Sequence, residues 1–141
     1  MTAQGGDILA WLETAITARE EAARSVGYDQ IEAVDYLWGT KHLLLRRGVG
    51  VKASTELDAA LADHIALRDP SSVLRRCAAD RKLLDLHGGR GHGCPAHDYD
   101  GDLDEFARFY NHETCPVVQH LADSYGWTAG QTPPAEGDHV T

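Results

Sequence analysis

Residues 62–87, ADHIALRDPSSVLRRCAADRKLLDLH, decide the fold, because they contain the end of one expected helix and the whole of the next. Asp69 is suited to cap a helix, and Pro70 fits the first helical turn, where no amide hydrogen is needed. From Pro70 to about Leu86, apolar residues recur at helical spacing, and the pair of glycines after this segment ends the helix. Its expected buried face consists of Val73, Leu74, Cys77, Ala78, Arg81 and Leu84.

A second helix is expected directly upstream, beginning near Ser54 or Thr55. Thr55 and Asp58 have the spacing of a capping box, in which two side chains satisfy the first free amides of a helix. This helix would be joined to the next almost without a loop, so the two must turn sharply on one another. Its expected buried stripe consists of Leu57, Ala60, Leu61, His64 and Ile65.

The N-terminal part of the chain predicts one more helix and one ambiguous segment. The helix runs from about Asp7 to Ser25, with apolar residues at helical spacing. Residues 28–53 admit two interpretations. Their aromatic and β-branched content favours one or two short strands, with a hairpin within 30–50. The alternative is a short helix through 29–37.

The C-terminal part predicts two further helices. The first spans 102–111 and begins with a capping pattern formed by Asp102 and Glu105. The second begins at Pro116 and is closed by Gly126. The sequence therefore predicts a mainly α fold: one small helical domain of about five helices over 1–127, with a short β-hairpin as one alternative for 30–50 and a zinc-knuckle-like loop. Residues 128–141 are polar and contain proline, which predicts a disordered tail.

The loop after the central helix, HGGRGHGCPAH at 87–97, carries residues that bind metals. Cys94 and His97 are separated by two residues, the usual spacing of a metal-binding turn. His87 lies in the last turn of a helix, and Cys115 lies at the start of another, where the helix dipole favours a thiolate. We predict a zinc site formed by His87, Cys94, His97 and Cys115, because zinc suits a set of two cysteines and two histidines.

This interpretation leaves alternatives open. His92 and His112 could replace one of the ligands, and the segment could be a mobile glycine-rich loop. If metal binds, four protein ligands leave no position for water, so the ligand count favours a structural site and a protein that is not an enzyme. The rival hypothesis is a metal-dependent hydrolase that uses three of these ligands and an acidic residue to activate water.

Charge restricts the class of partner. The 141 residues include 13 Lys and Arg against 22 Asp and Glu, a formal net charge of −9. This balance disfavours nucleic acid and an anionic membrane surface, and it favours a protein partner, either a host protein or a second copy. Trp38 and Trp127 are candidate anchors for such a partner. An acidic mimic of nucleic acid is a third hypothesis.

No signal peptide is recognised, so we expect a cytoplasmic protein with reduced cysteines.

Three blocks of the sequence resemble a family of actinobacteria and their phages known as domain of unknown function 6221. The blocks are DILAWLETAITARE, the central segment quoted above, and CPVVQHLADSYGW. Many members of the family carry a second cysteine where this chain has His97, and residues 98–113 look like extra sequence. The resemblance implies a small intracellular accessory protein, of bacterial or phage origin, and it implies no activity. The residues that carry it are His64, Ile65, Ala66, Arg68, Asp69, Pro70, Val73, Leu74, Arg75, Ala79, Lys82, His87, Cys115, Pro116, Leu121, Ala122 and Tyr125.

Overall fold

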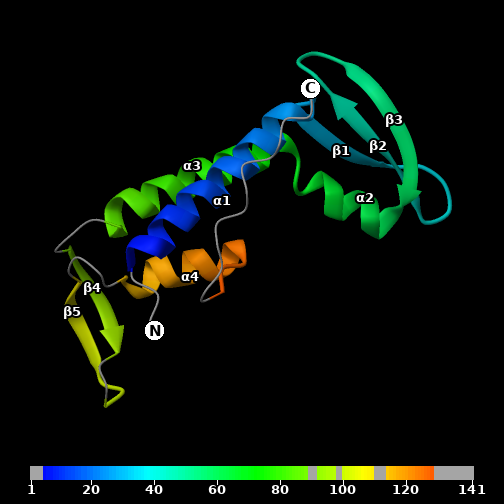
Figure 1. Ribbon diagram of the computed structural model, residues 1–141. Helices are drawn as coiled ribbons and strands as arrows, with labels where there is room; N and C mark the ends of the chain where they lie inside the picture. The colour runs from blue at the N-terminus through cyan, green and yellow to red at the C-terminus, as the bar shows by residue number, and fades with distance from the viewer. Residues whose placement is uncertain (1–4, 89–91, 98–99, 110–113, 129–141) are drawn as a thin grey trace. The chain divides into compact units, whose positions relative to one another are not determined.

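The computed structural model describes residues 5–88, 92–97, 100–109 and 114–128 (Figure 1). Within these ranges it contains four helices and five strands, and the strands form two antiparallel sheets. The prediction of a mainly α fold is therefore wrong, and the fold is mixed α/β. The elements in chain order are α1 Gly5–Ser25, β1 Gln30–Asp35, β2 Thr40–Arg46, β3 Val51–Asp58, α2 Ala59–Ala66, α3 Pro70–His87, β4 His92–His97, β5 Leu103–Phe109 and α4 Pro116–Tyr125.

The chain divides into two compact units. The sheet unit comprises residues 19–77, and the metal-centre unit comprises residues 1–18 and 78–141. That residues 1–127 form a single domain stays a prediction. The disordered tail was predicted for 128–141, and residues 129–141 of it lie outside the described ranges.

The sheet unit contains the three-stranded antiparallel sheet, in the order β1-β2-β3. Gln30 pairs with Arg46 at one end of the first hairpin, and Asp35 pairs with Lys41 at the other. The hairpin interpretation of this segment is therefore correct, and the short helix through 29–37 is wrong. Helix α2 contacts all three strands, which covers one face of the sheet. Among the strand residues of this sheet, Leu43 of β2 is buried and the others are half-buried or exposed.

The second expected helix begins later than the sequence pattern indicated. Thr55 lies in β3, where it pairs with Leu43 of β2, so the capping box that starts at Thr55 does not form. Asp58 instead caps α2, because its carboxylate accepts hydrogen bonds from the backbone N–H groups of Ala60 and Leu61 at 3.1 and 3.3 Å. The residues before Asp58 form the third strand of the sheet. The spacing of apolar residues along the sequence does not reveal the hydrogen bonds between strands.

The turn between β1 and β2 has an unusual residue at its centre. The backbone N–H of Thr40 donates to the carbonyl of Leu37 at 2.9 Å and closes the turn. The two central residues, Trp38 and Gly39, have φ angles of 41° and 82°. Positive φ at both positions is the mark of a type I′ turn, for which Asn-Gly is the favoured pair. Glycine adopts this backbone freely, whereas tryptophan is strained there.

Replacing Trp38 with asparagine should therefore stabilise the protein. Asparagine tolerates positive φ, and the Trp38 side chain is 99% exposed, so little packing is lost. We expect the free energy of unfolding to rise by about 1 kcal/mol in urea denaturation. Trp38→Ala is the control, because alanine keeps the strain. An asparagine variant no more stable than the alanine variant would contradict the strained-turn assignment.

The central helix lies where the sequence placed it, over Pro70–His87. Asp69 caps it, since its carboxylate accepts a hydrogen bond from the backbone N–H of Ser72 at 2.7 Å. Partial burial acts to raise the pKa of Asp69, but hydrogen bonds from the Ser72 side chain and backbone outweigh it and hold this pKa below its ordinary value. The cap is therefore charged at neutral pH, which favours the helix start.

The metal-centre unit is built on helices. Four apolar residues of α1 at helical spacing are buried, as predicted: Ile8, Leu12, Ala15 and Ile16. Side-chain hydrogen bonds join the helices: the Tyr125 hydroxyl of α4 donates to an Asp80 carboxylate oxygen of α3 at 2.7 Å, and Arg81 of α3 donates to the Thr17 hydroxyl of α1 at 2.9 Å. The buried apolar residues of this unit are Ile8, Trp11, Leu12, Ala15, Ile16, Leu84, Cys94, Cys115, Val118, Leu121, Ala122 and Tyr125.

The helix predicted over 102–111 is wrong. Leu103–Phe109 forms β5 and pairs with β4, with Phe109 opposite His92 and Leu103 opposite His97. Apolar residues of this short segment fit a helical spacing, but a short apolar run fits a strand equally well. Pairing with β4 decides between the two, because it satisfies the backbone hydrogen bonds of both strands.

Candidate metal centre

Strand β4 presents two of the metal-binding side chains on one face. Successive side chains of a strand point to opposite faces, so His92 and Cys94 share a face. Burial follows this alternation: Cys94 is buried and His92 is half-buried, whereas His97 is exposed. Residues two apart in a strand can therefore reach one ion together, while residues three apart point away from each other.

His87 is the last residue of α3, and Gly88 follows it directly. A Cβ atom on Gly88 would lie 2.6 Å from the carbonyl oxygen of Leu84 and 3.2 Å from the side chain of Leu9. Such a close approach excludes any side chain at this position. The backbone N–H of Gly88 also donates to the Leu84 carbonyl at 2.7 Å, which closes the last turn of α3 beside His87.

Cys115 occupies the N-cap position of α4, directly before Pro116. Cys115 is fully buried. The sulfur lies 3.7 Å from Nδ1 of His87 and 3.9 Å from the His87 carbonyl oxygen. The N-terminus of a helix stabilises negative charge, which favours a thiolate ligand at this place.

The four side chains of His87, His92, Cys94 and Cys115 form a single group, called the metal cluster below. One ligand atom from each lies within 4.8 Å of the ligand atoms of the other three. In a tetrahedral zinc site, bond lengths near 2.0 Å for nitrogen and 2.3 Å for sulfur separate neighbouring ligands by about 3.3–3.8 Å. The 3.7 Å between Cys115 and His87 is already in this range. The metal cluster could thus hold a metal ion after small side-chain adjustments.

Aromatic contacts orient the two imidazoles. The His92 ring stacks on Phe109 of β5, with ring centroids 5.8 Å apart and an interplanar angle of 25°. The His87 and His92 rings meet edge to face at 5.5 Å. Phe109 lies opposite His92 in the strand register, so the hairpin supplies both the ligand and the ring that supports it.

Burial and a neighbouring sulfur both act on the thiol of Cys94. Burial raises the pKa of Cys94, and the neighbouring Cys115 raises it further, because two adjacent thiolates repel each other. A divalent cation reverses this effect by attracting both thiolates, so metal binding releases protons.

The structure brings together three of the four ligands that the sequence indicated, His87, Cys94 and Cys115. The fourth member of the metal cluster is His92, which the sequence offered as an alternate. His97 lies exposed at the end of β4 and is not among the four. His112, the other alternate, lies outside the described residues. The spacing His-x-Cys would have identified His92 if the segment had been recognised as a strand.

A family model described as a family of unknown function (DUF6221) matches residues 5–126. The chain belongs to this family. The resemblance noted in the sequence is thus confirmed, and the match includes every member of the metal cluster. The family supplies no activity for the chain. None of the curated proteins and none of the solved structures matches it significantly.

In the described part of the chain, no helix is both long enough and apolar enough to cross a membrane.

Proposed function

We propose that this protein is a small protein-binding module whose metal-centre unit is held together by a structural zinc ion. The observation that carries the proposal is the convergence of His87, His92, Cys94 and Cys115, with their ligand atoms within 4.8 Å of one another. These residues come from the end of α3, from β4 and from the start of α4. One ion would therefore link the ends of two helices with the strand β4 that lies between them in the chain.

The chemistry of the donors favours zinc. Two thiolates and two imidazoles are a common ligand set for structural zinc, whereas magnesium and calcium prefer oxygen. Neither Cys94 nor Cys115 is in a disulfide, so both sulfurs are available to a metal. The proposal includes a reducing, cytoplasmic environment, in which thiolate ligands persist.

The same ligand set favours a structural role over hydrolysis. Four protein ligands complete a tetrahedral sphere, and hydrolysis requires an open position for water and a nearby general base. The metal cluster contains no carboxylate among the described residues. A structural ion leaves binding as the role of the module, and the net charge of −9 favours a partner with basic groups.

Two histidine variants test the ligand set. His92→Ala should weaken zinc binding by more than about tenfold, because the loss of a residue that only supports a ligand already weakens metal binding about 10–100-fold. His97→Ala is the matched control, because it removes an exposed histidine from the same strand. Competition with a chromophoric chelator measures both affinities. Equal weakening in both variants, or weakening only in His97→Ala, would refute the assigned set.

A further inference from the structure

The tip of the first hairpin in the sheet unit exposes a group of large apolar side chains. Trp38 is 99% exposed, and its neighbours Tyr36 and Leu37 are 52% and 53% exposed. These three consecutive residues are called the aromatic tip below. A fully exposed tryptophan is rare on a surface that binds nothing, since large apolar side chains are usually covered.

The backbone of the aromatic tip is held in place. The Thr40 hydroxyl donates to the Leu37 carbonyl at 2.7 Å and lies 2.9 Å from a carboxylate oxygen of Glu56. The Gly39 carbonyl accepts a hydrogen bond from the backbone N–H of Ala59, at the start of α2, at 3.0 Å. The tip is thus joined to both β3 and α2. A partner would meet a preorganised surface, which lowers the entropy lost on binding.

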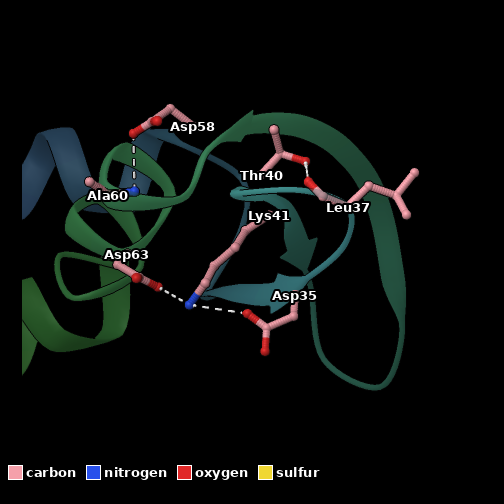
Figure 2. A network of polar contacts seen from close by, with 7 residues as sticks. All are labelled: Asp35, Leu37, Thr40, Lys41, Asp58, Ala60 and Asp63. Carbon is pink, nitrogen blue, oxygen red and sulfur yellow. Dashed lines mark hydrogen bonds and ion pairs between the residues drawn. The ribbon is translucent and has the colours of Figure 1, made fainter.

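Carboxylates surround the aromatic tip. Asp35 and Glu56 lie on β1 and β3 beside the turn, Asp58 caps α2, and Asp63 lies within α2. The one ammonium among them, Lys41, is already engaged: its Nζ lies 2.7 Å from Asp63 and 3.6 Å from Asp35 (Figure 2).

The hydrogen bond to Asp63 raises the pKa of Lys41 and keeps it charged. Four carboxylates against one ammonium leave this surface negative.

The strain at Trp38 adds an independent observation. A positive φ of 41° is unfavourable for tryptophan, and the side chain has almost no contacts that would offset this cost. Backbone strain in proteins concentrates at binding and catalytic positions. The combination of strain and full exposure is therefore better explained by a contact with another molecule than by a role in the fold.

We propose that the aromatic tip and its carboxylates bind an arginine- and lysine-rich segment of a partner protein. The indole face of Trp38 attracts a guanidinium or ammonium group through a cation–π interaction. Asp35, Glu56 and Asp63 supply opposite charges for neighbouring basic side chains. A second copy of this chain fits less well, because it would place the same carboxylates against each other. The inference uses only the sheet unit and does not depend on metal.

Binding of a fluorescein-labelled nona-arginine peptide to the full chain, followed by fluorescence anisotropy, tests this proposal. Trp38→Ala should weaken binding about tenfold, as expected for an anchor residue. Phe106→Ala is the matched control, since it removes another exposed aromatic, on β5 of the metal-centre unit, and it should bind like the native chain. Absence of binding by the native chain would overturn the proposal, and so would equal affinity of the two variants.

Further variants separate the contact from effects on folding. Trp38→Asn should be more stable than the native chain yet bind the peptide about tenfold more weakly. Asp35→Asn should weaken binding severalfold, and added salt should reduce the difference between this variant and the native chain. Sedimentation velocity tests whether a second copy of this chain, and not a basic peptide, binds at the aromatic tip. A native dimer that Trp38→Ala converts to a monomer, with unchanged peptide affinity, would assign the tip to self-association and overturn the proposal.

Discussion

Cys115→Ser is expected to abolish stoichiometric zinc binding and to unfold the metal-centre unit. The sulfur of Cys115 lies close to His87 and belongs to a fully buried residue, and a serine hydroxyl would be a much poorer zinc ligand than a thiolate. Structural zinc supplies on the order of 10 kcal/mol to the folding of small domains, comparable to the whole stability of a domain. Elemental analysis and circular dichroism should therefore show no zinc and a marked loss of helix.

Cys77→Ala is the matched control for this variant. Cys77 is 1% exposed, as deeply buried as Cys115, but it is not a member of the metal cluster. The control should lose some stability through its smaller side chain and keep one zinc per chain. A strong chelator should reproduce the loss of structure in the native chain. A Cys115→Ser protein that is folded and binds as much zinc as the control would contradict the structural role.

Asp80→Ala should destabilise the protein by about 2–4 kcal/mol, from a lost buried hydrogen bond and a new cavity. Asp80 is 6% exposed, and one of its carboxylate oxygens accepts a 2.7 Å hydrogen bond from the Tyr125 hydroxyl. Removing the carboxylate leaves this buried hydroxyl without the acceptor that joins α4 to α3. Urea denaturation measures the change in the free energy of unfolding.

A double-mutant cycle isolates the contact between the two helices. Tyr125→Phe removes the donor, and the double variant with Asp80→Ala should be less destabilised than the sum of the single changes, with a coupling of about 1–2 kcal/mol. Asp85→Ala is the control for loss of a carboxylate from the same helix, since Asp85 is exposed, and it should change stability by less than about 0.5 kcal/mol. Strict additivity in the cycle would show that the hydrogen bond contributes nothing.

Helices with strong end signals could be predicted from the sequence. Asp69 and Pro70 mark the start of α3, and the structure confirms both the cap and the helix. Pro116 and Gly126 mark the ends of α4 equally well, and Gly126 has the left-handed φ of 90° that such a cap requires. These signals lie within or next to the helix itself, so the sequence of that segment is enough to predict where the helix begins and ends.

Strands β3 and β5 could not be predicted in this way. Leu57 with Ala60 and Leu61, and Leu103 with Phe106, fit the spacing of a helical stripe, although β3 ends at Asp58 and Phe106 is exposed on β5. The pairing of these strands with β2 and β4 decides their structure, and that pairing joins residues that are distant in sequence.

The residue types of the candidate site, two histidines and two cysteines, could be predicted from the sequence, but one of the two histidines could not. Clustering of histidine and cysteine around 87–97 drew attention to the correct segment. The choice of His97 assumed a turn, in which residues three apart converge on one ion. In the strand that the structure contains, His92 is on the same face as Cys94 and joins the metal cluster.

The central claim is that one zinc ion is held by His87, His92, Cys94 and Cys115. X-ray absorption at the zinc edge, on the full chain purified without added metal or chelator, tests it most directly. We predict one zinc per chain, with two sulfur neighbours at about 2.3 Å and two nitrogen neighbours at about 2.0 Å. A well-folded protein without metal, or a zinc surrounded only by nitrogen and oxygen, would contradict it.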